Sequence, residues 1–357
     1  MVSVRQRSAP TCRFLLLSTF RFLSVVFCCS VSIPSRAQDG GSADAFYHGR
    51  QLTIISGSAV GGGYDAYARL VGRHLPKFMP ANVRFVIQVM PGGGSLIATN
   101  TLYNISPRDG SVLGFVQRGV LTAPLLDPKA MNYHYDARRF NWLLSLNAEA
   151  GLIIVRNSAP HTSVADLFTT ELTISSAGGA TEIFPHLLRN LFGMKVRIVS
   201  GYKGAAEAYL ALERGEVQGR ISTGFDKAVL TPWIADKTVR LLMSISLKKH
   251  PYFPDLPLVT EQIRTESDRE VVELLLAEQL AGRPILMPPE VPKDRVALMR
   301  EAMEKMVRDK SFLAEAEKLN LDIDPVGGEE IAALLDKVYR TPPETVARTR
   351  DIISVRN

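Results

Sequence analysis

The sequence predicts an α/β protein of two lobes with a ligand cleft between them, and three observations carry this prediction. Apolar runs of four to seven residues alternate with stretches of helical periodicity, the pattern of βαβ units and a mainly parallel sheet. A glycine-rich loop follows the first of these runs, and a second small-residue loop follows another run about 120 residues later. Removal of a predicted 37-residue leader leaves 320 residues, which is enough for two domains.

The elements follow in chain order from these patterns. Predicted strands are Leu52–Ile55, Val83–Val89, Ser111–Val116, Leu152–Val155, Leu172–Ser175, Lys195–Val199, Val217–Ile221, Val239–Ile245 and Pro284–Met287. Predicted helices are Asp65–Leu75, Ser95–Tyr103, Val164–Phe168, Thr181–Leu191, Ala205–Glu213, Glu270–Gln279, Lys293–Lys305, Phe312–Leu319 and Glu329–Lys337.

The chain is expected to cross twice between the lobes. Extended segments flank residues 147–150, the predicted first crossing, and the return is expected between residues 251 and 279. The predicted domains are a signal peptide at 1–37, a discontinuous first lobe at 38–148 plus 266–357, and a second lobe at 149–265. A double crossing predicts a hinge that lets the lobes close on a ligand.

The first 37 residues read as an export signal. Four arginines precede an apolar segment at 22–33, and Ser35-Arg36-Ala37 fits the small-x-small cleavage pattern. The apolar core of about 12 residues is shorter than the roughly 20 that a spanning helix needs. We therefore expect cleavage before Gln38 and a periplasmic mature protein.

Removal of the leader also changes the chemistry that is available to the protein. The three cysteines all lie in the leader, so the mature chain has no disulfide, cysteine nucleophile or thiolate metal site. The leader carries five arginines and no acid, which leaves 37 basic against 36 acidic residues. This balance gives no argument for a nucleic-acid partner. We expect no cofactor and no metal.

The first glycine loop is the leading site candidate. Ser58, Ala59 and Gly61-Gly62-Gly63 lie between the first strand and a helix that opens with Tyr64 and Asp65. Glycine lets the backbone approach a ligand closely, and the N–H groups of the first helical turn favour an anion. The alternative is a tight turn without a ligand. Asp65 suits the helix dipole, and we favour this structural role for it over ligand contact.

Two further loops are expected at the same edge of the first sheet. Gly92-Gly93-Gly94 precede Ser95, which we assign as a helix N-cap. Gln117 and Arg118 follow another strand. Ligands of open α/β sheets bind beyond the carboxyl ends of the strands. An arginine there can form a bidentate pair with a carboxylate, but a solvated arginine at the rim is the interpretation we prefer.

The second lobe repeats the arrangement. Ser175, Ser176, Gly178, Gly179 and Thr181 offer hydroxyl groups and backbone N–H groups at a helix start. Arg220 and Ser222 follow a later strand, and Arg220 carries the same two interpretations as the arginine of the first lobe.

Catalysis is not expected. Six histidines remain in the mature chain, and none has the His-x-x-x-His or Glu-x-x-His spacing of a metal site. His74 and His186 fall in predicted helices, where we expect them to face solvent or bond a carbonyl group. Gly94-Ser95 lacks the further glycine of a nucleophile elbow.

The ordered set of motifs resembles the extracytoplasmic solute-binding receptors of the tripartite tricarboxylate transporter family, the Bug or TctC-like proteins. The resemblance spans residues 51–335. Its motifs are Gly61-Gly62-Gly63-Tyr64-Asp65 with Ala68-Arg69, Pro91-Gly92-Gly93-Gly94, Pro107-Arg108-Asp109-Gly110, Ser175–Gly179, Tyr202-Lys203-Gly204, Gly215-Glu216-Val217 and Pro254-Asp255-Leu256-Pro257.

The resemblance implies a type II periplasmic-binding-protein fold that closes on a carboxylate. It implies ligand contacts from Ala59, Gly62, Gly63 and Tyr64 on one lobe, with Ser176, Gly178, Gly179 and Thr181 on the other. The chain departs from the family pattern in three places. Residues 57–59 lack the usual prolines and aromatic residue, Tyr64 replaces a threonine, and an acidic residue is missing near Ser222, which argues against an amino-acid ligand.

The predicted function is therefore a receptor, expected to be a monomer, that captures an organic acid and delivers it to integral membrane transporter subunits. The alternative is a ligand-binding sensor subunit that partners a membrane signalling kinase.

Overall fold

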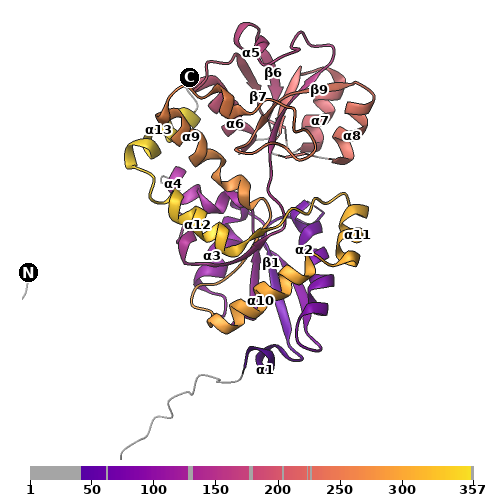
Figure 1. The fold of residues 1–357 in the computed structure, drawn as a ribbon, viewed down its shortest axis with the longest axis vertical. Coiled ribbons are helices and arrows are strands. Elements are labelled where there is room, and N and C mark those ends of the chain that lie inside the picture. Colours follow the sequence, from indigo (N-terminus) through magenta and orange to yellow (C-terminus); the bar gives the residue numbers. More distant parts are fainter. Residues whose placement is uncertain are drawn as a thin grey trace, which may run out of the picture. The chain divides into compact units, whose positions relative to one another are not determined.

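The computed structural model describes residues 42–61, 63–127, 132–176, 180–202, 205–222, 224–225 and 227–354. Two β-sheets occupy this part of the chain, and helices surround each of them (Figure 1). The predicted leader lies outside the described residues.

The first sheet is the centre of lobe 1, and its strand order is β11-β4-β10-β3-β1-β2. Its strands are β1 (Gln51–Ser56), β2 (Arg84–Val89), β3 (Val112–Phe115), β4 (Asn141–Ser145), β10 (Pro284–Met287) and β11 (Val326–Gly327). Strand β1 is parallel to β2 and β3, whereas β10 is antiparallel to β3 and β4. Two distant parts of the chain therefore build one sheet.

The second sheet is the centre of lobe 2, and its order is β7-β6-β8-β5-β9. Its strands are β5 (Gly151–Arg156), β6 (Leu172–Ser175), β7 (Val196–Val199), β8 (Gly219–Ser222) and β9 (Val239–Ile245). Strand β6 is parallel to β7 and β8, and β5 is antiparallel to β8 and β9. Strand β11 is antiparallel to β4, so the first sheet has two reversed strands, β10 and β11, and the second sheet has one, β5.

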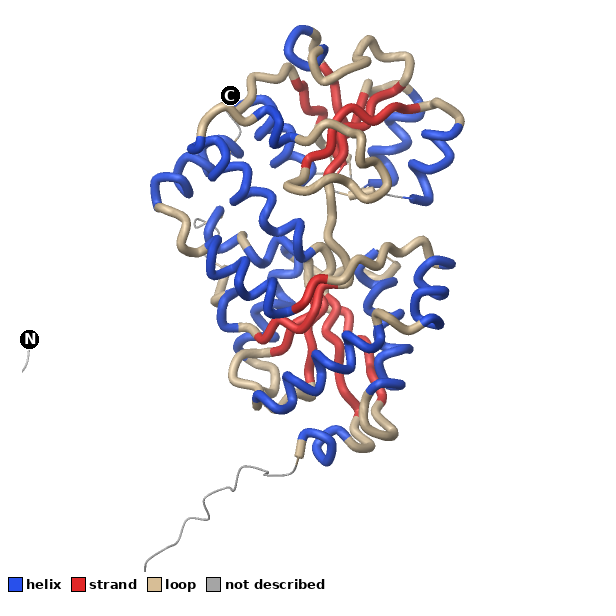
Figure 2. The backbone as a smooth tube through the Cα atoms, viewed as in Figure 1, coloured by secondary structure: helices blue, strands red, loops and turns tan. Residues whose placement is uncertain are grey.

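Helices flank both sheets, as Figure 2 shows in blue around the red strands. They are α1 (Ala43–Tyr47), α2 (Gly63–His74), α3 (Leu96–Asn104), α4 (Ala123–Leu126), α5 (Asp166–Thr169), α6 (Ala180–Asn190), α7 (Ala205–Arg214), α8 (Lys227–Ala235), α9 (Glu266–Leu276), α10 (Lys293–Met306), α11 (Lys310–Lys318), α12 (Gly328–Val338) and α13 (Pro343–Ile353). Short 3₁₀ turns follow β3 at Arg118–Leu121 and α9 at Ala277–Ala281.

Strand β1 shows why helices are needed on both faces of the first sheet. Leu52 and Ile54 are fully buried in a core that also holds residues of α2 and α10. Ile55 points to the opposite face, into a core with Ala98 and Leu102 of α3. Because successive strand residues alternate between faces, an apolar run of this kind requires cover on both sides.

The predicted α/β class with two lobes is confirmed, but the sheets are mixed rather than mainly parallel. Helices α8 and α13 were not expected from the sequence. Pro232 lies inside α8, and Pro342 and Pro343 open α13. Proline disfavours a helix interior but fits the first turn, so the apolar periodicity of both helices is easy to miss.

Two connecting segments run side by side between the lobes. The backbone N–H of Glu149 donates to the Gln279 carbonyl at 2.8 Å, and that of Gly282 donates to the Asn147 carbonyl at 3.0 Å. A Cβ atom on Gly282 would lie 2.7 Å from Asn147 Oδ1, so the close approach requires glycine.

The boundaries of the lobes stay a prediction, and the packing of two helices bears on them. Val271 and Val272 of α9 and Ile352 of α13 are buried in the core of lobe 2. Asn190 of α6 also donates through Nδ2 to the Ile352 carbonyl at 2.6 Å. We propose that α9 and α13 belong to lobe 2.

Candidate functional site

A cavity of about 1080 Å³ is lined by residues of both lobes. Lobe 1 contributes residues that follow β1 and β3, and lobe 2 contributes residues of α7, β8 and the segment 250–252. Of the predicted site residues, its lining includes Gly63, Tyr64, Gln117, Arg118 and Ser222.

The other predicted residues fall into two groups. Those that the structure describes outside the lining lie between β1 and the start of α2 or between the end of β6 and the start of α6: Ser58, Ala59, Gly61, Asp65, Ser175, Ser176 and Thr181. No described residue of the segment 175–181 lines the cavity. Three lie outside the described residues: Gly62, Gly178 and Gly179.

Ser95 joins the loops that follow three elements of lobe 1. Its buried hydroxyl donates to the Gly57 carbonyl at 3.0 Å and accepts from the Gln117 backbone N–H at 3.0 Å. A Cβ atom on Gly57 would lie 2.3 Å from Ser95 Oγ, so glycine is needed there. Ser95 occupies the predicted N-cap position of α3, but it has φ +75° and its side chain makes no capping hydrogen bond.

Asp65 shapes the first glycine loop from the helix side. Its side chain is buried, and Oδ2 accepts from the Gly61 backbone N–H at 3.0 Å and from Arg69 Nε at 2.9 Å. The hydrogen bond from Arg69 is the largest cause that lowers the pKa of the Asp65 carboxyl, and Gly61 adds to it. The carboxylate therefore holds the loop closed upon α2.

Tyr64 fills the wall between that loop and the connecting segments. Its hydroxyl donates to the Gly282 carbonyl at 2.8 Å and accepts from the Arg118 backbone N–H at 3.2 Å. The Arg283 guanidinium lies 4.2 Å from the centre of its ring. Burial raises the pKa of the phenol, so it stays protonated and keeps the donor that Gly282 requires.

Arg118 belongs to a buried group of four charges, and our preferred interpretation of it as a solvated rim residue is wrong. Its guanidinium is ion-paired with Glu149 and, through Nε at 3.2 Å, with Glu278. Glu149 also accepts from Arg283 Nη1 at 2.6 Å. Burial is the largest influence on the pKa of Arg283 and lowers it, but Glu149, Tyr64 and Tyr67 together outweigh burial and raise that pKa.

The sequence analysis missed Glu149 and Arg283, because their position depends on the direction of two strands. Each residue precedes a reversed strand, β5 or β10. The amino end of an antiparallel strand lies at the same edge as the carboxyl ends of its neighbours. An expectation of mixed sheets would therefore have placed both residues at the cavity.

The predicted hydroxyl residues of lobe 2 have partners within lobe 2. Ser175 Oγ donates to the Ala208 carbonyl at 3.2 Å. Ser176 Oγ lies 2.9 Å from Thr181 Oγ1, which closes the loop upon α6. Ser222 lines the cavity, and its hydroxyl donates to the Gly224 carbonyl at 2.8 Å.

Arg220 lines the cavity from β8 and is also buried, with 4% of its surface exposed. Its guanidinium carbon lies 4.6 Å from the centre of the Tyr209 ring. The Nε and Nη1 atoms are buried and have no hydrogen-bond partner among the residues that the structure describes. The preference for a solvated rim position is wrong for this arginine too.

The lobes also meet at Asp322, which follows α11. Its carboxylate forms an ion pair with Lys227 of α8 and accepts from the Tyr252 hydroxyl at 2.8 Å. Its carbonyl accepts from the Tyr67 hydroxyl of α2 at 2.9 Å. These four residues line the same cavity.

The two histidines expected to face solvent or to bond a carbonyl group are buried and contact charged side chains instead. His74 is buried, and its Nε2 lies 2.6 Å from Glu315 Oε2. His186 is buried as well, and its Nδ1 lies 3.0 Å from Arg189 Nη2.

Across the described residues, no group of three or more His, Cys, Asp or Glu side chains is arranged to hold a metal ion. No helix in that same part of the chain has the length and apolar character to cross a membrane.

A family comparison agrees with this architecture. Residues 68–354 match the model of the tripartite tricarboxylate transporter family receptor, TctC. The chain belongs to this receptor family. The resemblance predicted from the motifs is thus confirmed, and the TctC-family chain is a solute-binding receptor.

Individual proteins support the same fold for this TctC-family receptor. A UPF0065 protein in the TAR-I ttuE-ttuC' intergenic region of Agrobacterium vitis is 25% identical over 341 residues, 92% of this chain and 90% of that protein. A TctC solute-binding protein from Polaromonas has a TM-score of 0.65 at 18% identity, over 86% of this chain and 99% of that one.

Two similar structures contain ligands. A Rhodopseudomonas palustris protein with bound malate has a TM-score of 0.59 at 19% identity, over 85% of this chain and 99% of that one. An R. palustris protein with adipate has a TM-score of 0.61 at 21% identity, over 85% and 97%. The predicted periplasmic-binding-protein fold is confirmed by these likenesses.

Proposed function

We propose that this receptor captures a small carboxylated solute between its lobes and delivers it to a tripartite tricarboxylate-type membrane transporter. The observation that carries the proposal is the cavity of about 1080 Å³, lined by strand-end loops of both lobes in a chain of this family. The malate and adipate in two proteins of similar fold support an organic acid as the solute.

The start of α2 suits a carboxylate. Gly63 opens this 12-residue helix and lines the cavity. The first N–H groups of a helix have no partner inside it, and the helix dipole favours an anion there. We infer that one ligand carboxylate binds at residues 58–65, and that residues 175–181 and Ser222 approach it from lobe 2.

The setting of the receptor follows from its family and its predicted leader. Residues 1–37 have the pattern of a cleavable signal peptide, and related proteins are periplasmic binding proteins. We infer that the mature chain acts in the periplasm as a monomer. Closure of the lobes on the acid would then create the form that docks on the membrane subunits.

The first test is a thermal scan of the protein from Gln38 onward, refolded to remove co-purified ligand. A panel of mono-, di- and tricarboxylates, aromatic acids and amino acids is added. Ligand at 100 times its dissociation constant stabilises the fold by about 2.7 kcal/mol, so one acid class should raise Tm by several degrees. A flat response to every acid would contradict the proposal. Full uptake of the identified acid by cells that lack the protein would also contradict the proposal, and it would favour the alternative of a ligand-binding sensor.

Gly63→Val tests the place of binding. The nearest described atom to a Cβ on Gly63 is Arg283 Nη2 at 3.9 Å, so the added carbons enter the cavity rather than the core. We expect Tm without ligand to stay near the wild-type value and affinity to fall tenfold or more, about 1.4 kcal/mol. Gly327→Val is the matched control, because nothing lies within 4 Å of its Cβ position in β11. Wild-type affinity in Gly63→Val would give the glycine loop a purely structural role.

A further inference from the structure

Arg220 occupies the middle of the second sheet. In β8 it pairs with Ile154 of β5 on one side and with Ser175 of β6 on the other. Ser222, two residues later, shares its face of the strand and also lines the cavity. The guanidinium lies over the Tyr209 ring, at 4.6 Å from its centre, which fixes the plane of the charged group. A central strand and an aromatic ring therefore hold this cation at the cavity.

No ion pair joins this cation to an acid among the described residues, whereas the other two arginines that line the cavity have such pairs. Arg118 and Arg283 are each ion-paired with Glu149. Arg220 is buried, at 4% exposure, yet its Nε and Nη1 atoms have no hydrogen-bond partner within the described chain. A buried charge is costly unless it is paired and hydrogen-bonded. The described residues supply no acid for this cation, and a ligand that enters the cavity can supply one.

We propose that Arg220 binds a carboxylate of the ligand and selects acids that carry a second carboxylate. This inference rests on the proposed function, in which the first carboxylate lies at the glycine loop of lobe 1. Guanidinium groups match the planar carboxylate through parallel N–H···O bonds. The ligand class is therefore a diacid that spans the cavity, with one charged end on each lobe.

The test measures binding of succinate, glutarate, adipate, pimelate and suberate, and of the half-amide of each, by titration calorimetry. The half-amide keeps the length and removes one charge. We expect wild-type protein to bind at least one diacid about 10- to 100-fold more tightly than its half-amide. In Arg220→Met this preference should collapse, because the diacid then loses its partner and the half-amide loses little.

The stability of the unliganded protein provides a second readout. Because the Arg220 charge has no acidic partner among the described residues, Arg220→Met should leave Tm unchanged or raise it. Arg295→Met is the matched control. Arg295 is also buried and lies 3.6 Å from the centre of the Phe46 ring, but it donates to the Asp109 carbonyl at 2.7 Å. Its loss should lower Tm and leave the affinity for the diacid unchanged.

The possible outcomes separate this inference from the proposed function. If wild-type protein binds none of the carboxylates tested, both fail. If it binds a diacid but Arg220→Met keeps the wild-type preference for the diacid over the half-amide, only the role of Arg220 fails. The same holds if the wild type binds diacid and half-amide equally. Arg220→Lys, which keeps the charge without the planar fork, should bind with intermediate affinity, and it replaces the methionine variant if that one does not fold.

Discussion

Arg118, Glu149, Glu278 and Arg283 show how single side chains set the wall of the cavity. Each glutamate faces an arginine, and Glu149 faces two. Loss of one partner of a buried ion pair leaves an uncompensated charge and costs about 3–5 kcal/mol. Such a group holds its atoms in fixed places, which a binding wall requires.

His250 gives a prediction at the scale of one residue. It is buried against Phe225 and Phe253, with ring centres 5.8 and 5.0 Å away, and it lines the cavity. Burial lowers the pKa of its imidazole, although Asp322 opposes the shift. In the unfolded chain the imidazole has a pKa of about 6.5, so the unfolded chain takes up a proton there first as the pH falls. The contribution to the free energy of unfolding is therefore fully present above about pH 6.5. It is lost as the pH falls through the lower pKa that the imidazole has in the folded state.

His250→Phe should keep the ring packing and lose less stability between about pH 7.5 and pH 5 than the wild type. Urea unfolding at several pH values measures this. Burial also lowers the pKa of His186, so the variant should keep part of the slope. Similar unfolding free energies of variant and wild type at pH 7.5 would show that the fold is intact. An unchanged slope would contradict the prediction.

The strand-end loops of lobe 1 act as one unit at the scale of elements, because one hydroxyl joins them. Ser95 bonds Gly57 after β1 and Gln117 after β3. The Gln117 side chain reaches further, with Nε2 at 3.4 Å from Ser58 Oγ in the glycine loop. The position of the glycine loop thus depends on a residue almost 40 positions away.

Ser95→Ala should destabilise the protein by about 1–3 kcal/mol, because the Gln117 N–H and the Gly57 carbonyl lose a buried partner. The affinity for the acid should fall as well, since the loops lose the hydroxyl group that joins them. Denaturant unfolding and calorimetry measure the two effects. Ser354→Ala is the control: its exposed hydroxyl donates only to the Asp351 carbonyl, at 2.7 Å. A change within about 0.5 kcal/mol in Ser95→Ala, as expected for surface substitutions, would show that the loops are independent.

Most strands and the long helices could be predicted from the sequence, because their apolar residues recur at the period of the element. Strands β6, β9 and β10 have the predicted bounds. The direction of β5 and β10 could not be predicted, since periodicity does not show whether a strand is antiparallel to its neighbours. The charged wall was missed for the same reason. Arg118 and Glu278 lie 160 residues apart, and only the folded sheet brings them together.

At the scale of the whole molecule, Asp322 is a contact that joins the lobes. Its charge pairs with Lys227, and both side chains are about three-quarters buried. Ion pairs near the surface contribute up to about 1 kcal/mol. Because this pair forms across the cavity, its energy favours the arrangement in which the lobes are together.

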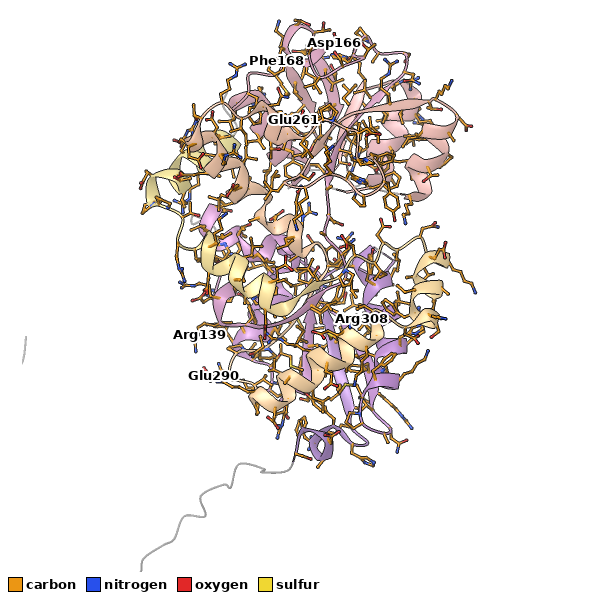
Figure 3. All side chains as sticks on the ribbon, viewed as in Figure 1. Arg139, Asp166, Phe168, Glu261, Glu290 and Arg308 are labelled. Carbon is orange, nitrogen blue, oxygen red and sulfur yellow. The ribbon has the colours of Figure 1, made fainter. Side chains whose placement is uncertain are left out.

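Asp322→Asn should therefore weaken acid binding about two- to fivefold, mainly through faster dissociation. Stopped-flow and equilibrium titrations measure it. Arg139→Ala is the control. Figure 3 labels Arg139 and its partner Glu290, an exposed pair at 2.8 Å that lies within lobe 1. Unchanged dissociation in Asp322→Asn would show that this contact does not hold the lobes together.

The packing of α13 has a practical consequence. The described chain starts beside α1, which packs on α10 of lobe 1, and it ends after α13, which packs on α6 and α9. All cysteines lie in the predicted leader. Cysteines introduced at the exposed Ser42 and Ser354 would thus be the sole thiols of a protein that begins at Gln38. A pair of fluorophores attached there would report each opening and closing event in single molecules through the energy transfer between the two dyes.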